Sequence, residues 1–148
     1  MKPKILFILH LPPPIHGAAM MGKYIQESEL INSSFDCFCI NLATAGSLSD
    51  IGHISLKKLL KYFFLLKHIS NVVREIRPEL VYITPNAGRK AFFKDFIVVQ
   101  MLKSMGCKVI AHYHNKGVSV YQSKWVYNFF YKRFFSNLKV ILLSLIHI

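Results

Sequence analysis

The amino-acid sequence predicts an α/β domain built on a doubly wound parallel sheet. Short, continuous apolar runs alternate with helix-like segments along the 148 residues, and each connection between successive runs is long enough for a right-handed crossover. Apolar runs without polar alternation indicate strands buried on both faces, as in parallel sheets covered by helices. We expect strands over residues 4–11, 35–42, 80–85, 108–114 and 139–144.

Helices are predicted between these strands, over residues 18–31, 56–77, 89–105 and 123–135. In the second of these helices, apolar residues recur at helical spacing, and Pro78 ends the pattern. Gly106 is expected to cap the end of the third helix, and Ser123 the start of the fourth. Residues 43–55 are rich in Ala, Gly and Ser, which predicts a mobile loop.

The net charge of +12 is the strongest compositional signal. Such an excess of Lys and Arg favours an anionic partner, either a nucleic acid, a lipid surface or a phosphorylated ligand. The sequence has no motif that reads nucleic acid, so we expect no nucleic-acid partner. A hydrophobic fraction of 53% excludes a disordered chain, and no apolar run approaches the ~18 residues that a membrane span needs.

The cysteines and the N-terminus predict a cytoplasmic protein. Cys37 and Cys39 would share one face of a strand and bridge poorly. Together with Cys107 they are expected to be buried thiols in a reducing compartment. The N-terminal apolar run is short and lacks a small-residue cleavage site, so we expect no secretory signal peptide.

The simplest strand order for this pattern is 2-1-3-4-5, with the reversal between the first and third strands. Ligands bind at the carboxyl ends of parallel strands near such a reversal, so the stretches "HLPPPIHG", "TPNAG" and "HYHNKG" are expected to converge there. The candidate substrate-binding residues in these stretches are His16, Gly17, Asn86, His112, Asn115 and Lys116, and His114 is the candidate catalytic residue.

The loop after the first strand combines Pro12, Pro13 and Pro14 with Gly17. Gly17 would let the backbone approach a ligand, and the helix behind it would direct free N–H groups at a phosphate or a sugar hydroxyl. The prolines would stiffen the loop and lower the entropy lost on binding. The alternative is that the prolines only end the strand and Gly17 only makes the turn.

His112 and His114 are two residues apart, so they point the same way if the strand extends that far. Three interpretations stay open. The histidines are ordinary polar residues at a strand end, a pair that contacts a ligand, or part of a metal site. No Cys or carboxylate is placed to complete a metal site, so we expect no metal.

The seven carboxylates exclude several enzyme classes by their placement. Most fall in predicted helices or precede strands, which leaves only Asp50 within reach of the expected site. A hydrolase with paired acids is therefore not expected. The sequence also lacks a Gly-x-Ser-x-Gly elbow, a Walker loop and a Gly-x-Gly-x-x-Gly loop.

Several segments of the sequence resemble bacterial glycosyltransferases of the family-four type. They are "KILFILHLPPPIHGAAMMGKYI", "SLSDIGHISLKKLLKYF", "RPELVYITPNAGRKAFFKD" and "KVIAHYHNKGV", and the resemblance covers nearly all of residues 3–144. It implies one Rossmann-like domain of a two-domain GT-B architecture, in which the N-terminal domain chiefly binds the acceptor and the C-terminal domain holds the nucleotide sugar. It also implies transfer between the domains, usually with retention at the anomeric carbon and without a bound metal.

The resemblance also assigns roles to individual residues. In this family the glycine loop after the first strand lies near the donor diphosphate; here only Gly17 matches, and His16 stands where many members have a second glycine. The histidine that ends the strand in "IAHYHN" contacts the transferred sugar in relatives. His114 fits that position best, and His112 is second.

Compared with this family, the chain lacks the C-terminal half and the Glu-x7-Glu motif that grips the nucleotide sugar. We therefore expect residues 1–144 to form the acceptor-binding domain and to be inactive alone, because the donor-binding domain is missing. Residues 145–148 do not continue the family pattern and resemble a translated adapter tail on a truncated reading frame.

The expected function is transfer of a sugar from a nucleotide-sugar donor to a cell-envelope glycan or a lipid-linked acceptor, with no further cofactor. Lys and Arg flank "YFFLL" and "WVYNFFYKRFF", and such basic, aromatic helices can lie on an anionic membrane surface, here the inner face of the cell membrane. The alternative function is therefore a non-catalytic basic domain that binds anionic membranes. A simpler interpretation of both segments is that Leu and Phe pack on the sheet or under a missing domain while the lysines face solvent.

Overall fold

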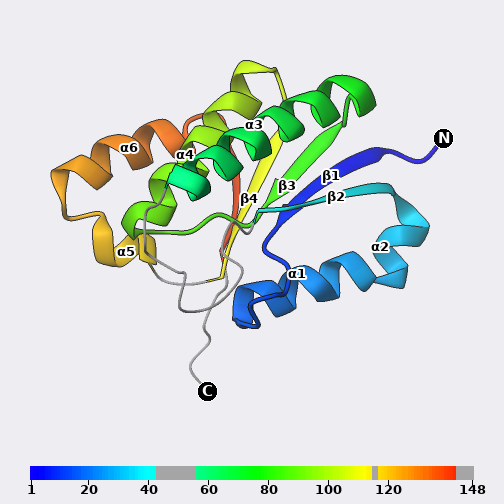
Figure 1. The fold of residues 1–148 in the computed structure, drawn as a ribbon, viewed down its shortest axis with the longest axis horizontal. Helices are drawn as coiled ribbons and strands as arrows, with labels where there is room; N and C mark the ends of the chain where they lie inside the picture. The colour runs from blue at the N-terminus through cyan, green and yellow to red at the C-terminus, as the bar shows by residue number, and fades with distance from the viewer. Residues whose placement is uncertain (43–55, 115–116, 143–148) are drawn as a thin grey trace. The chain divides into compact units, whose positions relative to one another are not determined.

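The computed structural model describes residues 1–42, 56–114 and 117–142. These residues form an α/β fold with a five-stranded parallel sheet flanked by helices (Figure 1). The strand order is β2-β1-β3-β4-β5, so the predicted fold class and the predicted strand order are confirmed. The strands are β1 (Lys4–Leu9), β2 (Asp36–Asn41), β3 (Leu80–Ile83), β4 (Val109–Tyr113) and β5 (Lys139–Leu142).

The helices also follow the predicted alternation, with two additions. They are α1 (Gly17–Glu27), α2 (Glu29–Ser34), α3 (Leu56–Ile76), α4 (Arg89–Ser104), α5 (Gly117–Tyr121) and α6 (Trp125–Phe135). The loop expected over 43–55, with Asp50 in it, and the tail expected over 145–148 lie outside the described residues. None of the described helices is both long and apolar enough to cross a bilayer.

The chain divides into two compact units, Met1–Tyr82 and Ile83–Ile148. In the first unit, Ile5 to Leu9 are five consecutive buried residues of β1, which confirms that this strand is covered on both faces. Ile5, Phe7 and Leu9 pack against Ile25 of α1 and Ile31 of α2. The burial of each such side chain contributes on the order of 2 kcal/mol, so β1 is the centre of this core.

The predicted helix over 18–31 is two helices, because Ser28 breaks it. The backbone of Ser28 is extended, and its Oγ accepts a hydrogen bond from the Ile31 N–H at 3.4 Å. A serine in this geometry ends one helix and caps the next. The chain therefore turns between α1 and α2, which lie beside β1 and β2 (Figure 1).

Helix α3 is amphipathic in sequence, but its apolar stripe is covered unevenly. Ile69 and Val73 in its C-terminal half are buried. In the N-terminal half, Leu59, Leu60 and Phe63 are all more than half exposed among the described residues. The predicted helix is therefore confirmed, whereas packing of its whole apolar face is not seen.

In the second unit, an aromatic cluster joins α4 to α6. Phe92 is fully buried, and its ring lies 4.8 Å from Tyr131 and 5.8 Å from Phe134, centroid to centroid. Aromatic pairs at such distances add about 0.5–1.5 kcal/mol each beyond the burial of the rings. Helix α6 thus has a buried aromatic face, while Trp125 and Phe129 point into solvent.

The two predicted caps in this unit have different outcomes. Gly106 has a φ of +76°. The Cys107 N–H donates to the Leu102 carbonyl at 3.1 Å, and the Gly106 N–H donates to the Lys103 carbonyl at 2.9 Å. This pattern is a Schellman motif, so the cap at Gly106 is confirmed. Ser123 is not a cap, because α6 begins at Trp125 and Lys124 is its N-cap residue, without a side-chain bond.

The expectation of three buried thiols is wrong in part. Cys39 is exposed, whereas Cys37 and Cys107 are half-buried, and all three are free. Cys37 and Cys39 lie on β2, which is an edge strand with a neighbour on only one side. An edge strand has less of its surface covered, and this explains the exposure of Cys39.

Gly22 is predicted to be required by the contact between α1 and β1. A Cβ at this position would overlap the backbone carbonyl oxygen of His10, whereas a Cβ at Gly17 would meet nothing within 4 Å. Gly22→Ala should therefore lower the free energy of unfolding by about 1–3 kcal/mol, and the matched control Gly17→Ala should be neutral or stabilising by up to ~1 kcal/mol. Urea denaturation measures both, and equal stability of the two variants would contradict the packing described.

Candidate functional site

In the first unit, His16 is the N-cap residue of α1. Its Nδ1 accepts a hydrogen bond from the Ala19 N–H at 3.3 Å, and its ring lies 6.1 Å from that of His10. A neutral His16 that accepts at Nδ1 has its proton on Nε2, so Nε2 is the nitrogen available to a ligand. The sequence pointed to His16 as a ligand contact, and the structure gives it a capping role as well.

Gly17 is the first residue of α1, is exposed, and has open space around it. Its backbone is not in the left-handed region, so the fold does not demand a glycine there. The glycine that permits close approach of two backbones in this unit is Gly22, which sequence reasoning missed. The loop before α1 is nonetheless held in place, because Pro14 is buried and the Leu11 N–H donates to Asn41 Oδ1 at 3.2 Å.

In the second unit, His112 lies on β4 and His114 follows the strand directly. Their ring centroids are 4.2 Å apart, so the expectation that the two side chains point the same way is confirmed. Both ring nitrogens of His114 are buried, and neither has a hydrogen-bond partner among the described residues. Such a ring has one donor and one acceptor to offer.

The environment keeps this histidine pair neutral. Burial lowers the pKa of His114, and the nearby His112 lowers it further. Burial also lowers the pKa of His112. Both rings therefore act near pH 7 as neutral hydrogen-bonding groups and not as cations, which suits contact with hydroxyl groups. No group of three or more His, Cys, Asp or Glu side chains in the described parts of the chain is arranged to hold a metal ion.

Asn86 follows β3 in the same unit and is held by Asp95 of α4. The backbone N–H of Asn86 and its side-chain Nδ2 both donate to Asp95 Oδ2, each at 2.7 Å. Asp95 is 0% exposed, and burial raises the pKa of its carboxyl group from 3.8 to about 6, against the lowering effect of the Asn86 bonds. The other oxygen, Oδ1, is also buried and has no partner among the described residues.

The next two residues of this loop are also held by named contacts. The hydroxyl of Tyr131 donates to the carbonyl of Ala87. The ring of Tyr121 lies so close to Gly88 that a Cβ there would overlap it, and the Arg89 Nε donates to the Tyr121 hydroxyl at 3.4 Å. Contacts from α4, α5 and α6 therefore fix the loop, which is favourable for a binding site because little order remains to be lost.

Asp95 was missed by sequence reasoning, which placed this carboxylate on a helix away from the site. The signal that identifies it is helical spacing. Phe92, Val98 and Leu102 of α4 are fully buried, and residues three and four apart lie on one face of a helix. Asp95 lies on this buried face, and a carboxylate on a buried face needs polar partners nearby.

The predicted site residues are thus divided between the two units. His16 and Gly17 belong to the first unit, and Asn86, His112 and His114 to the second. Within the second unit the structure brings His112 and His114 together. Asn115 and Lys116 lie outside the described residues, and convergence of all the predicted residues on one site stays a prediction.

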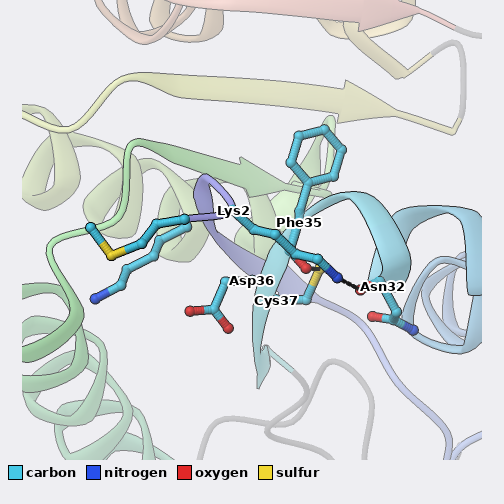
Figure 2. Close-up of a pocket in the computed structure, with 7 residues that line it drawn as sticks. Lys2, Asn32, Phe35, Asp36 and Cys37 are labelled. Carbon is cyan, nitrogen blue, oxygen red and sulfur yellow. Dashed lines mark hydrogen bonds between the residues drawn. The ribbon is translucent and has the colours of Figure 1, made fainter.

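An open pocket of about 510 Å³ lies elsewhere in the first unit. It is formed at the amino ends of β1 and β2, where the Lys2 Nζ donates to the Asn32 carbonyl at 3.3 Å (Figure 2). Asp36, Phe35 and Cys37 also line it. Ligands of parallel α/β sheets bind at the carboxyl ends of the strands, so we do not assign the function to this pocket.

Comparison of the chain with protein-family models, with curated proteins and with solved structures finds no match. The chemistry of the described residues and the resemblance in sequence therefore support the function as a proposal.

Asp95 is predicted to make stability depend on pH. The Asp95 carboxyl group keeps its proton up to about pH 6 in the folded state, whereas the unfolded chain releases it near pH 4. The free energy of unfolding that this group contributes is therefore lost as the pH rises through about 6. A pKa shift of this size corresponds to about 3 kcal/mol. The stability of Asp95→Asn relative to wild type should therefore increase by up to about this amount between pH 4 and pH 7, as measured by urea denaturation.

The exposed Asp36→Asn is the matched control for this measurement. Its stability relative to wild type should change far less over the same range, because Asp36 is exposed to water whereas Asp95 is buried. A pH-independent difference for Asp95→Asn would contradict the burial of an ionisable carboxylate at this position.

Proposed function

We propose that the chain is the acceptor-binding, Rossmann-like domain of a two-domain GT-B glycosyltransferase. In this proposal the full enzyme transfers a sugar from a nucleotide-sugar donor to a cell-envelope glycan or a lipid-linked acceptor at the cytoplasmic face of the membrane. The observation that supports it best is the neutral pair of His112 and His114, in which neither ring nitrogen of His114 has a hydrogen-bond partner among the described residues. A neutral imidazole at the end of a parallel strand is suited to bind sugar hydroxyls.

The roles of the site residues follow from their chemistry. His114 positions the transferred sugar and stabilises charge that develops on it, and His112 supports His114. The N–H groups of Gly17 and Ala18 at the start of α1 bind the leaving diphosphate in this proposal. The Ala19 N–H does not take part, because it already donates to His16 Nδ1. Asn86, Asn115 and Lys116 contribute further hydrogen bonds to substrate. The reaction in this proposal is retaining, uses no metal, and needs a donor-binding domain besides this chain.

His114→Ala is the direct test. In a protein that joins this chain to a donor-binding domain, we expect kcat for sugar transfer to fall by about 10²-fold or more. Stability should change little, because the ring nitrogens make no hydrogen bond within the described residues. Transfer of radiolabelled sugar to membrane acceptors, with a panel of nucleotide sugars, measures the rate.

His68→Ala is the matched control, since His68 is an exposed histidine on α3. It should leave kcat and stability unchanged. A full-length protein in which His114→Ala transfers sugar at the wild-type rate would remove His114 from the catalytic role.

A second candidate function, binding to anionic membranes without catalysis, is favoured by the charge of the second unit. Its only carboxylate is Asp95, which is buried. Trp125 is 82% exposed and Phe129 63% exposed on α6, next to this positive charge. The Lys and Arg residues of the unit are Arg89, Lys90, Lys94, Lys103, Lys108, Lys116, Lys124, Lys132, Arg133 and Lys139.

If this second function is correct, the chain binds vesicles that contain phosphatidylserine and is released by salt, because exposed cations are screened. Replacement of both Trp125 and Phe129 by Ser should weaken binding by about tenfold or more, since each inserted aromatic side chain contributes on the order of 2 kcal/mol. Co-sedimentation with vesicles measures the binding of wild type and variant, with neutral phosphatidylcholine vesicles as the control. Salt-sensitive binding that no nucleotide sugar affects, in a full-length protein without transferase activity, would favour this function over the first.

A further inference from the structure

We propose that Asp95 is a positioning residue that fixes the side-chain amide of Asn86 in one orientation for contact with a hydroxyl-bearing ligand at the end of β3. The identity of that ligand, the sugar or the glycan acceptor, rests on the proposed function. The positioning itself rests on the contacts of Asp95, all of which lie within the second unit.

The geometry of the pair limits how Asn86 can move. One carboxylate oxygen of Asp95 accepts from both the backbone N–H and the side-chain Nδ2 of Asn86, at 2.7 Å each. Two bonds from one residue to one buried oxygen fix its backbone and its amide plane together. Because the amide is planar, its Oδ1 is then held on the side away from Nδ2 and Asp95, as an oriented hydrogen-bond acceptor.

The energetic cost of Asp95 argues against a role in stability alone. The carboxyl group is 0% exposed, one of its oxygens has no partner among the described residues, and burial disfavours its charged form. An apolar residue would pack on Phe92 and Val99 of the same helix face without that cost. Proteins tolerate such local conflicts where a functional site requires them.

The surrounding loop supports the same role. Asn86 is held by α4, Ala87 by the Tyr131 hydroxyl of α6, and Gly88 by the ring of Tyr121 in α5. Consecutive residues are therefore fixed by different helices, which is how a binding loop is kept in its bound shape. Among these contacts, only the one from Asp95 reaches a polar side chain of the loop.

Among the described residues, few other charged groups influence the charge of Asp95. Lys94, its neighbour on α4, favours the ionised form, and Asp95 in turn raises the pKa of Tyr113 on β4, which stays neutral. Tyr113 is 1% exposed and its hydroxyl has no partner among the described residues. A pH titration between 4 and 8 therefore reports mainly on Asp95 and Asn86 in this part of the fold, with the His112–His114 pair as the other titrating groups nearby on β4.

The first test is NMR on the chain itself, which is independent of any enzymatic activity. We expect the two side-chain N–H signals of Asn86 to be well separated, to exchange slowly with water, and to shift as the pH crosses about 6. In Asp95→Ala the signals should shift and exchange faster with water, because the bond from Nδ2 to Asp95 is lost. Signals that are unchanged in the variant would overturn the proposal.

A second variant separates positioning from stability. Asn86→Ala removes the side-chain amide, while the backbone N–H of residue 86 can still donate to Asp95 Oδ2, so the fold should be retained even if Asp95→Ala unfolds. In the full-length enzyme we expect this variant to raise the KM for the acceptor by about tenfold or more with little change in the unfolding midpoint, because the oriented amide is lost. Wild-type KM and wild-type stability together in this variant would show that the amide does not contact the ligand and would overturn the proposal.

The two tests also distinguish this proposal from the proposed function. Ordered, pH-sensitive Asn86 signals in a protein that transfers no sugar would retain the positioning role and reject the transferase. Transfer activity with a freely mobile Asn86 would reject the positioning role and retain the transferase.

Discussion

Burial of β1 on both faces is the constraint on which the rest of the first unit depends. Five consecutive apolar residues of this strand are buried, and such a strand is stable only between neighbouring strands and under helices on each side. The connections of the chain must then return over the faces of the sheet, which makes the strands parallel. Parallel strands bring their carboxyl ends to one edge, so polar loops and helix starts gather there.

The second unit shows how one polar exception can be built into such an apolar framework. Its helix α4 buries Phe92, Val98 and Leu102 together with Asp95. The fold tolerates this buried carboxylate because two N–H groups of Asn86 donate to it and offset part of the free-energy cost of its desolvation. Loop and helix are thereby coupled: the loop is ordered by the carboxylate, and the carboxylate is tolerated because the loop is in place.

The charges of this unit suggest a division between long-range and short-range recognition. The sequence of this unit has ten lysines and arginines and a single Asp or Glu, the buried Asp95, so its positive charge attracts anions from a distance. Burial lowers the pKa of both histidines near the end of β4, and the nearby His112 lowers the pKa of His114 further, so both rings are neutral. Contact at that point is therefore a matter of directed hydrogen bonds, which fits a sugar hydroxyl better than a phosphate.

The sequence by itself determined the alternation of strands and helices, the strand order and the cap at Gly106, because hydrophobic periodicity, crossover length and glycine conformation are local properties. It also placed His112 and His114 on one face of a strand, since strand residues alternate with a period of two. The division of a helix at Ser28 comes from a local capping bond to the Ile31 N–H, which the sequence analysis missed. Only the tertiary structure decided that Gly22 and not Gly17 is the glycine of close approach, and that Asp95 reaches back to Asn86. These two features depend on which atoms meet after the chain has folded, and the sequence analysis did not predict them.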